Sequence, residues 1–185
     1  MGLSESIDRL LPNVAKPVRY LGGEYGSVIK PIEPGMIRYA FLFPDVYEVG
    51  MSHLGMKILY DVINHRPDAW CERVFSPWPD MHDAMKAAGV PLFSLESRTP
   101  VAEFDLLGIT LQYEMSYTNI LAALDLAGIP LRSRDRVSGP FVIAGGPCAF
   151  NPEPLSDFVD LFVLGDGEQS TLDTIDVFKT WREAG

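Results

Sequence analysis

The sequence predicts a single α/β domain in which a doubly wound parallel sheet carries helices on both faces. Three observations lead to this prediction. Short apolar runs alternate with segments whose apolar residues recur at helical spacing. The apolar runs end in stretches rich in glycine, proline and aspartate. Finally, 185 residues with 47% hydrophobic and 22% charged side chains suffice for about one domain with a substantial core.

The first part of the chain is predicted to be an N-terminal arm over residues 1–35, because prolines and glycines interrupt it repeatedly. It contains one expected helix over residues 4–11, with Ser4 as the N-cap. The first strand is expected over residues 37–43, where IRYAFLF forms the kind of continuous apolar run that is typical of a parallel strand.

After this strand, a loop is expected as far as Gly50, and Ser52 is expected to cap a helix over residues 54–64. The remaining expected elements are a strand over 71–75, a helix over 80–88 ended by Gly89, an extra strand or an extended link over 92–95, a strand over 104–111, a helix over 117–127 with Gly128 at its C-cap, strands over 141–144 and 161–164, and a helix beginning near Glu168.

Strand and helix thus alternate about five times within residues 36–185. Because strands joined through helices run parallel with right-handed crossovers, the alternation predicts a flavodoxin-like or Rossmann-like sheet of about five strands.

The candidate binding residues follow from this topology, since open parallel sheets bind ligands beyond the carboxyl ends of their strands. The predicted strands end in polar residues and glycines, and the glycines there suit a close backbone approach to a ligand. These candidate residues are Asp45, Glu48, Ser52, His53, Thr110, Leu111, Gln112, Gly145, Gly146, Gly165, Gly167 and Glu168.

Charge and composition exclude several classes of function. The formal net charge is −10, which argues against a basic nucleic-acid-binding surface and against docking on an anionic membrane. No apolar run approaches 18 residues and no signal peptide is recognisable, so we expect a cytoplasmic location. Cys71 and Cys148 lie far apart, and neither a disulfide framework nor a zinc or iron–sulfur motif is present in this segment.

No catalytic constellation is recognisable in the sequence. Neither GxGxxG after the first strand nor GxxxxGK[ST] occurs, so a nucleotide-binding loop is not predicted. The acidic residues at the strand ends have two readings: they cap the following helices, or they orient a ligand. A weaker hypothesis is a metal-dependent hydrolase that uses Asp45, Glu48 and His53.

Several longer strings of the sequence resemble one family, the radical SAM proteins that carry an N-terminal cobalamin-binding-like domain. The resemblance extends from about residue 11 to residue 180, and it rests on YLGGEY (20–25), FPDVYEVGMSHLG (43–55), FSPWPDM (75–81), LESR (95–98), GGPCAFNPEP (145–154) and LGDGE (164–168).

The resemblance implies that this chain is the non-catalytic N-terminal domain of a longer protein. A radical SAM barrel with a CxxxCxxC motif, a [4Fe–4S] cluster and S-adenosylmethionine is then expected downstream, as the partner of this domain in the same polypeptide. The chain itself contains no CxxxCxxC.

Cobalamin is the cofactor that the resemblance implies for this domain, although only part of the cobalamin motif set is present. The DxHxxG motif after the first strand is absent, Thr110-Leu111-Gln112 departs by one position from the expected Ser/Thr-x-Leu, and Gly145-Gly146 matches the expected glycine pair. The corrinoid is therefore expected to bind without a histidine ligand from that motif. The alternative is a scaffold or substrate-docking domain that has lost the cofactor.

Overall fold

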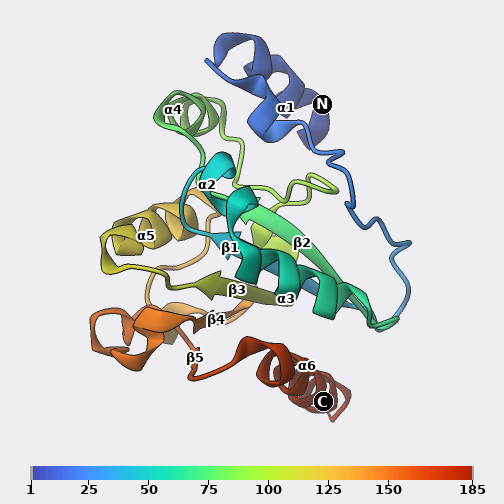
Figure 1. Ribbon diagram of the computed structural model, residues 1–185. Helices are drawn as coiled ribbons and strands as arrows, with labels where there is room; N and C mark the ends of the chain where they lie inside the picture. Colours follow the sequence, from blue (N-terminus) through green and yellow to red (C-terminus); the bar gives the residue numbers. More distant parts are fainter. Residues whose placement is uncertain (1, 185) are drawn as a thin grey trace.

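The computed structural model describes residues 2–184 and shows five parallel strands in the order β2-β1-β3-β4-β5 (Figure 1). The strands are β1 (Ile37–Phe43), β2 (Ala69–Phe75), β3 (Leu106–Thr110), β4 (Phe141–Gly145) and β5 (Leu161–Val163). This order is that of a flavodoxin-like doubly wound sheet, so the predicted fold class is confirmed.

Six α-helices accompany the strands within the described residues. They are α1 (Leu3–Leu10), α2 (Tyr47–Ser52), α3 (Leu54–Asn64), α4 (Pro79–Ala88), α5 (Tyr117–Leu126) and α6 (Gly167–Glu183). Short 3₁₀ helices lie at Leu11–Asn13, Pro17–Tyr20, Val101–Glu103, Glu114–Ser116, Ser133–Asp135, Pro147–Phe150 and Glu153–Leu155. Across the described residues, no helix has both the length and the apolar character needed to cross a membrane.

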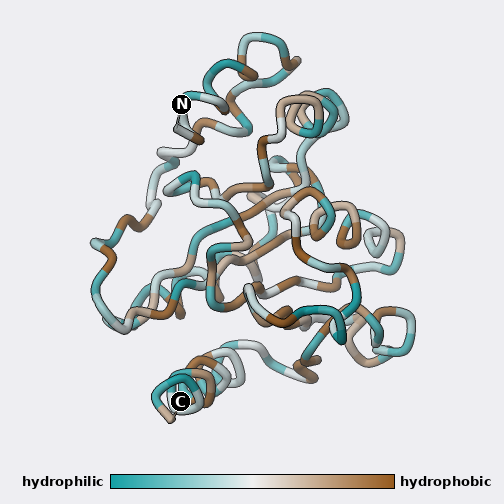
Figure 2. Tube along the Cα trace, turned by 180° about the vertical axis from the view of Figure 1, so that it is seen from behind, coloured by the Kyte–Doolittle hydropathy of each residue, from teal (hydrophilic) through white to brown (hydrophobic). Residues whose placement is uncertain are grey.

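The helices divide between the two faces of the sheet, as predicted. On one face, α1, α4 and α5 pack on side chains such as Ala40, Leu107 and Val142. On the other face, α3 and α6 pack on Tyr39, Phe41 and their neighbours. Figure 2 shows the hydrophobic residues of the strands running through the middle of the molecule between these helices.

The region between β1 and α3 differs from the prediction. Residues 47–52 form the short helix α2, where a loop was expected as far as Gly50. Ser52 lies in the last turn of α2 and does not cap α3. His53 is the N-cap of α3, and its Nδ1 accepts a hydrogen bond from the backbone N–H of Met56 at 3.2 Å. An imidazole nitrogen therefore takes the role that was assigned to a serine hydroxyl.

Other boundaries differ by one to two residues. The helix predicted over residues 4–11 is α1, whose N-cap is Gly2 and not Ser4, because the Gly2 N–H is held by the Glu5 carboxylate. The second strand begins earlier than predicted, since Ala69 and Trp70 pair with Ile37 and Arg38. The third strand is shorter than predicted and is preceded by the 3₁₀ turn that ends at Glu103.

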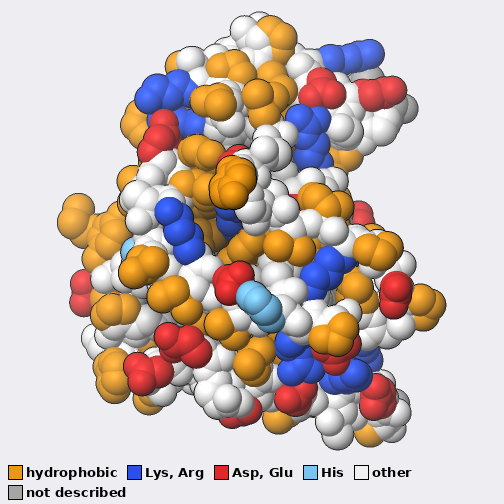
Figure 3. Space-filling view, turned by 45° about the vertical axis from the view of Figure 1, so that its right-hand side comes forward, with side chains coloured by type: hydrophobic (Ala, Val, Ile, Leu, Met, Phe, Trp, Pro, Cys, Tyr) orange, Lys and Arg blue, Asp and Glu red, His pale blue; other side chains and the backbone are white. Residues whose placement is uncertain are grey.

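Residues 92–95 form a connection with one isolated bridge between Phe93 and Pro100. The N-terminal residues also contribute to the core, where Ile7, Leu11 and Tyr20 pack on the face covered by α4 and α5. On the surface, acidic and basic side chains are interspersed, and hydrophobic side chains lie among them on the face shown in Figure 3.

Candidate functional site

A cavity of about 130 Å³ opens at the carboxyl edge of the sheet and extends between α3 and α6. Its walls come from the ends of β3, β4 and β5, and β1 contributes to its floor. Strand order reverses between β1 and β3, so the cavity lies at the topological switch point, where ligands bind in folds of this type.

The cavity brings together seven of the twelve residues that the sequence predicted for the site. These seven are His53, Thr110, Gln112, Gly145, Gly146, Gly165 and Gly167. They come from four different segments of the chain, which confirms that the carboxyl ends of the strands meet at one edge. Whether a ligand contacts them stays a prediction.

The loop after β4 is fixed tightly against the end of β3. The N–H of Leu111 donates to the carbonyl of Gly145 at 2.7 Å, and the N–H of Cys148 donates to the carbonyl of Leu111 at 3.1 Å. Gly146 has a φ of +112°, and a Cβ there would lie 2.9 Å from the Leu111 carbonyl oxygen. Only glycine fits this turn without strain, and the glycine pair thereby leaves backbone exposed at the cavity wall.

The polar side chains at the mouth of the cavity include no Asp, Glu, Lys or Arg. The amide nitrogen of Gln112 donates to the Thr110 hydroxyl at 2.6 Å. The Nδ1 of His53 accepts the Met56 N–H, so Nε2 is the ring nitrogen that can donate to a ligand. The ring centroid of His53 lies 5.2 Å from that of Phe43, which holds the imidazole in place.

Nine other wall residues were not predicted from the sequence, and Tyr39, Gly108 and Thr171 are the most informative of them. Tyr39 is 5% exposed and lies across Gly108, where an added Cβ would come within 2.1 Å of the tyrosine hydroxyl oxygen. Burial raises the pKa of Tyr39, with a smaller contribution from Cys71, so the phenol stays protonated. The one available signal was the glycine inside a predicted strand, which often marks a close approach.

Five predicted residues lie outside the cavity wall. Leu111 is buried in the core on the opposite face, Ser52 is exposed and donates to the Val49 carbonyl, and Glu168 is exposed in the first turn of α6. The two other residues are engaged elsewhere. Asp45 accepts hydrogen bonds from the Val46 N–H and from the Tyr113 hydroxyl, and Glu48 accepts from Arg19 and Lys16.

These hydrogen-bond partners account for the pKa shifts of Tyr113 and Glu48. The hydrogen bond to Asp45 raises the pKa of Tyr113, and partial burial adds to the effect. For Glu48, burial raises the pKa, but hydrogen bonds from its own backbone N–H and from Arg19 and Lys16 outweigh it and leave the pKa below its usual value. Both carboxylates thus serve as structural acceptors.

The hydrolase hypothesis loses its geometric basis here. Asp45, Glu48 and His53 have separate partners, and over residues 2–184 no three potential metal ligands converge.

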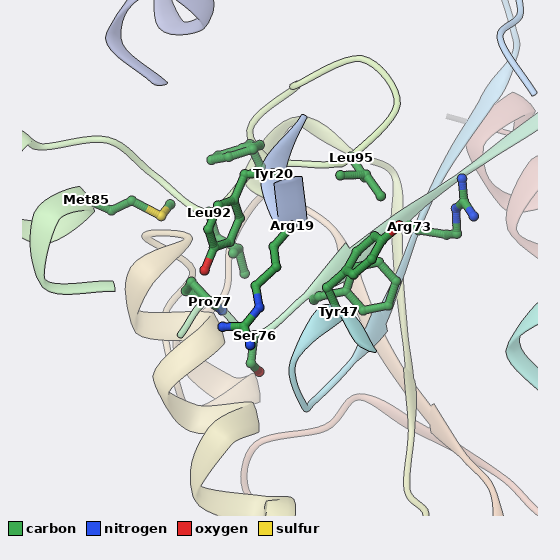
Figure 4. A pocket seen from close by; sticks show the side chains of 11 residues that line it. Arg19, Tyr20, Tyr47, Arg73, Ser76, Pro77, Met85, Leu92 and Leu95 are labelled. Carbon is green, nitrogen blue, oxygen red and sulfur yellow. The ribbon is translucent and has the colours of Figure 1, made fainter. Parts of the chain in front are cut away.

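A second, smaller cavity lies under the N-terminal arm (Figure 4). Its volume is about 20 Å³, which is the space of roughly one water molecule. Figure 4 shows the guanidinium group of Arg19 beside Ser76 and Pro77, while Arg73 is directed away from it. Arg19 donates to Glu48 and lies 5.0 Å from the centroid of the Trp78 ring, so the arm is fastened over this edge. This cavity is too small for an organic cofactor.

Comparison with known proteins identifies the family. Residues 55–185 match the family described as "Radical SAM proteins, N-terminal". The chain belongs to this family. The match includes β3, β4, β5 and α6, which form most of the cavity wall of this radical SAM N-terminal domain, whereas Tyr39 and His53 precede it.

One relative is the uncharacterized protein MJ0966 of Methanocaldococcus jannaschii. It is 29% identical to the chain over 133 residues, which are 71% of this chain and 24% of that protein. The chain thus corresponds to about a quarter of the length of this relative. No solved structure shows significant similarity to the chain.

Proposed function

We propose that this radical SAM N-terminal domain binds a corrinoid at the carboxyl edge of its sheet and presents it to a radical SAM domain that follows in the same polypeptide. The observation that carries the proposal is the cavity at the switch point, whose wall contains the glycine pair Gly145-Gly146. Family membership supports the link to radical SAM chemistry.

The properties of the cavity fit the planar ring at the end of the nucleotide tail of a corrinoid. No Asp, Glu, Lys or Arg side chain lines it, and apolar and glycine residues make up most of its wall. An engineered apolar cavity of about 150 Å³ accepts benzene, so 130 Å³ is on the scale of one aromatic ring. In addition, the Tyr39 hydroxyl has no partner among residues 2–184.

In this proposal the tail ring lies between Leu59 of α3 and Thr171 of α6, over Tyr39 and Gly108, with Gly145-Gly146 against the tail backbone. When bound, a corrinoid supplies a cobalt centre for radical or alkyl-group chemistry. The residues of the cavity wall would bind and orient the tail ring and shield it from water.

A matched pair of variants on α3 tests the corrinoid proposal. Leu59 lines the cavity, whereas Ile58 is 39% exposed and does not. We expect the 185-residue chain to bind hydroxocobalamin in equilibrium dialysis, and to convert methylcobalamin to the spectrum in which the tail base is off the cobalt. Leu59→Trp fills the space and should weaken binding at least about tenfold, while Ile58→Trp should not.

The proposal fails if wild-type chain binds no hydroxocobalamin at high micromolar concentration, or if both tryptophan variants bind it equally well. The linked radical SAM domain is tested separately, by reading the gene beyond Gly185. A coding sequence that continues without CxxxCxxC and without a radical SAM domain contradicts that part of the proposal.

A second candidate function, docking without a cofactor, is favoured by exposed apolar side chains at the carboxyl edge of the sheet. Tyr113, Met115, Phe150 and Leu164 lie on loops at the carboxyl ends of β3, β4 and β5 and are 39%, 87%, 71% and 57% exposed. Exposed apolar residues gathered at one edge are typical of interaction surfaces.

Docking is tested with the full-length protein divided between this chain and the part that follows. Met115→Ser with Phe150→Ser should weaken association of the two parts at least about tenfold in sedimentation velocity. The control is Val137→Ser, since Val137 is 98% exposed before β4, at the opposite edge of the sheet. Equal association of all three forms would eliminate this candidate.

A further inference from the structure

Two hydroxyl groups at the inner part of the cavity lack hydrogen-bond partners. Tyr39 is 5% exposed and Thr171 is 8% exposed, and both line the cavity. Neither hydroxyl forms a hydrogen bond with any described residue. Neither oxygen is among the fully enclosed unpaired polar atoms of the described residues, which belong to Arg38, Ser76, Tyr117 and Arg136, so both are accessible from the cavity. The two hydroxyls are therefore available to a hydrogen-bonding group that enters the cavity.

Hydroxyls beside the cavity are paired, although the buried hydroxyls of Ser76 and Tyr117, outside this cavity, also lack partners. Tyr60, on the same face of the sheet and 6% exposed, accepts a hydrogen bond from the Val28 N–H at 2.8 Å. On α6, the hydroxyls of Ser170, Thr174 and Thr180 all donate to the carbonyl four residues earlier. Thr171, on the same helix, does not. The nearby hydroxyls of Tyr60 and α6 that do not line the cavity are thus satisfied within the chain.

The position of Tyr39 depends on Gly108. Glycine in the interior of a buried strand weakens the strand, and it is often found where another group approaches the backbone closely. Here the atoms of the Tyr39 ring and hydroxyl would lie 2.1–2.6 Å from a Cβ at position 108. The glycine therefore makes room for a tyrosine whose hydroxyl has no partner in the chain and is available to a group in the cavity.

The surroundings of the two hydroxyls restrict the ligand. The absence of charged side chains from the cavity wall disfavours a charged group, because nothing there compensates for its desolvation. A volume of about 130 Å³ between two helices and a sheet suits one planar ring. The phenol remains protonated because burial raises its pKa, and it acts as a donor.

We propose that Tyr39, supported by Thr171, is the specificity-determining residue of this cavity and donates a hydrogen bond to a ring nitrogen of an uncharged heteroaromatic group. The inference deepens the proposed function, since it names the chemistry of the ring that the cavity accepts. It concerns the ring alone and does not require that the ring belong to a corrinoid.

Benzimidazole and indole are suitable probes because they share one shape and differ in the acceptor. Benzimidazole carries a ring nitrogen with a free lone pair, whereas indole carries only an N–H donor. We expect NMR titration of the wild-type chain to show that benzimidazole binds at least about tenfold more tightly than indole. The resonances that shift should include those of Tyr39 and Thr171.

Two substitutions complete the experiment. Tyr39→Phe removes the donor but keeps the ring, and it should reduce benzimidazole affinity about five- to tenfold while leaving indole affinity unchanged. Thr174→Val removes a hydroxyl of α6 that is bonded within the helix, so both affinities should stay at their wild-type values. Near-ultraviolet circular dichroism of each variant verifies the fold.

The outcomes separate this inference from the proposed function. If neither probe binds, if both bind equally, or if Tyr39→Phe leaves the preference intact, the inference is wrong. If benzimidazole binds in a Tyr39-dependent way but hydroxocobalamin does not bind, the corrinoid proposal fails and the inference stands. If hydroxocobalamin binds to wild type and to Tyr39→Phe equally, the inference fails and the corrinoid proposal stands.

Discussion

The two faces of the sheet are built from alternate residues of the same strands, yet they differ in how completely they are filled. On β3, Leu107 and Ile109 are directed to the α4 and α5 side, where large aliphatic side chains fill the space. Gly108 and Thr110 of the same strand line the cavity on the α3 and α6 side. A single strand therefore serves stability on one face and leaves space on the other.

The means of attachment also differ between the faces. Helix α5 is held by buried aliphatic residues such as Ile120 and Leu124. Helix α6 buries Ile175 but is also tied by ion pairs, because Arg66 and Lys179 both donate to Asp68 and Arg66 reaches Asp176. From this difference we expect the face covered by α4 and α5 to carry most of the folding free energy.

The largest expected effect is on the filled face. Leu107→Ala should lower the free energy of unfolding by about 2–5 kcal/mol, because Leu107 is 1% exposed and its removal leaves a void. Leu59→Ala on α3 should cost less than half as much, since Leu59 already faces a cavity. Urea denaturation of the two variants measures the comparison. Equal losses would show that the two faces contribute alike.

The next effect concerns the contact that shapes the cavity. Gly108→Ala should destabilise the fold by about 1–3 kcal/mol, because the new methyl group would lie 2.1 Å from the Tyr39 hydroxyl oxygen. Gly145→Ala is the matched control, since its nearest atoms would be 3.6 and 3.7 Å away, and it should stay within about 0.5 kcal/mol of wild type. If thermal and urea denaturation show equal effects, the Tyr39–Gly108 contact does not constrain this face.

The contrast between the two faces also explains how much of the fold and of the cavity wall could be predicted from the sequence. The apolar runs and helical spacings predicted the sheet and its faces, because burial imposes its period on the sequence. The glycines and polar residues at the strand ends predicted seven wall residues. Tyr39 was missed because an aromatic residue in an apolar strand is indistinguishable from core until its neighbours are known. The role of His53 as a helix cap was missed because imidazole is an uncommon cap.

A pH-dependent effect is expected on the cavity face. Hydrogen bonds from Arg66 and from Lys179 lower the pKa of Asp68 to about 2. A carboxylate with a lowered folded-state pKa stabilises the fold above its ordinary pKa, and this contribution is lost as the pH falls from about 4 through about 2. Because Asp68 is partly exposed, the loss is about 1–2 kcal/mol.

Hydrogen exchange between pH 5 and pH 2 locates this loss. The amides of α6 should lose protection as the pH falls, while those of α5 keep more of theirs. Asp68→Asn should remove the pH-dependent part in this window, because the amide cannot titrate. Parallel loss in both helices, or an unchanged profile in the variant, would place the acid sensitivity elsewhere.

The smallest expected effect distinguishes two buried tyrosines on one face. Without ligand, Tyr39→Phe should change the free energy of unfolding by less than about 0.5 kcal/mol, or increase it slightly, because the deleted hydroxyl satisfies no group. Tyr60→Phe should cost about 0.5–1.5 kcal/mol, because it leaves the Val28 N–H without its acceptor. A loss for Tyr39→Phe as large as that for Tyr60→Phe would mean that the Tyr39 hydroxyl serves the fold. An unchanged stability is the result that a role of this hydroxyl in ligand recognition requires.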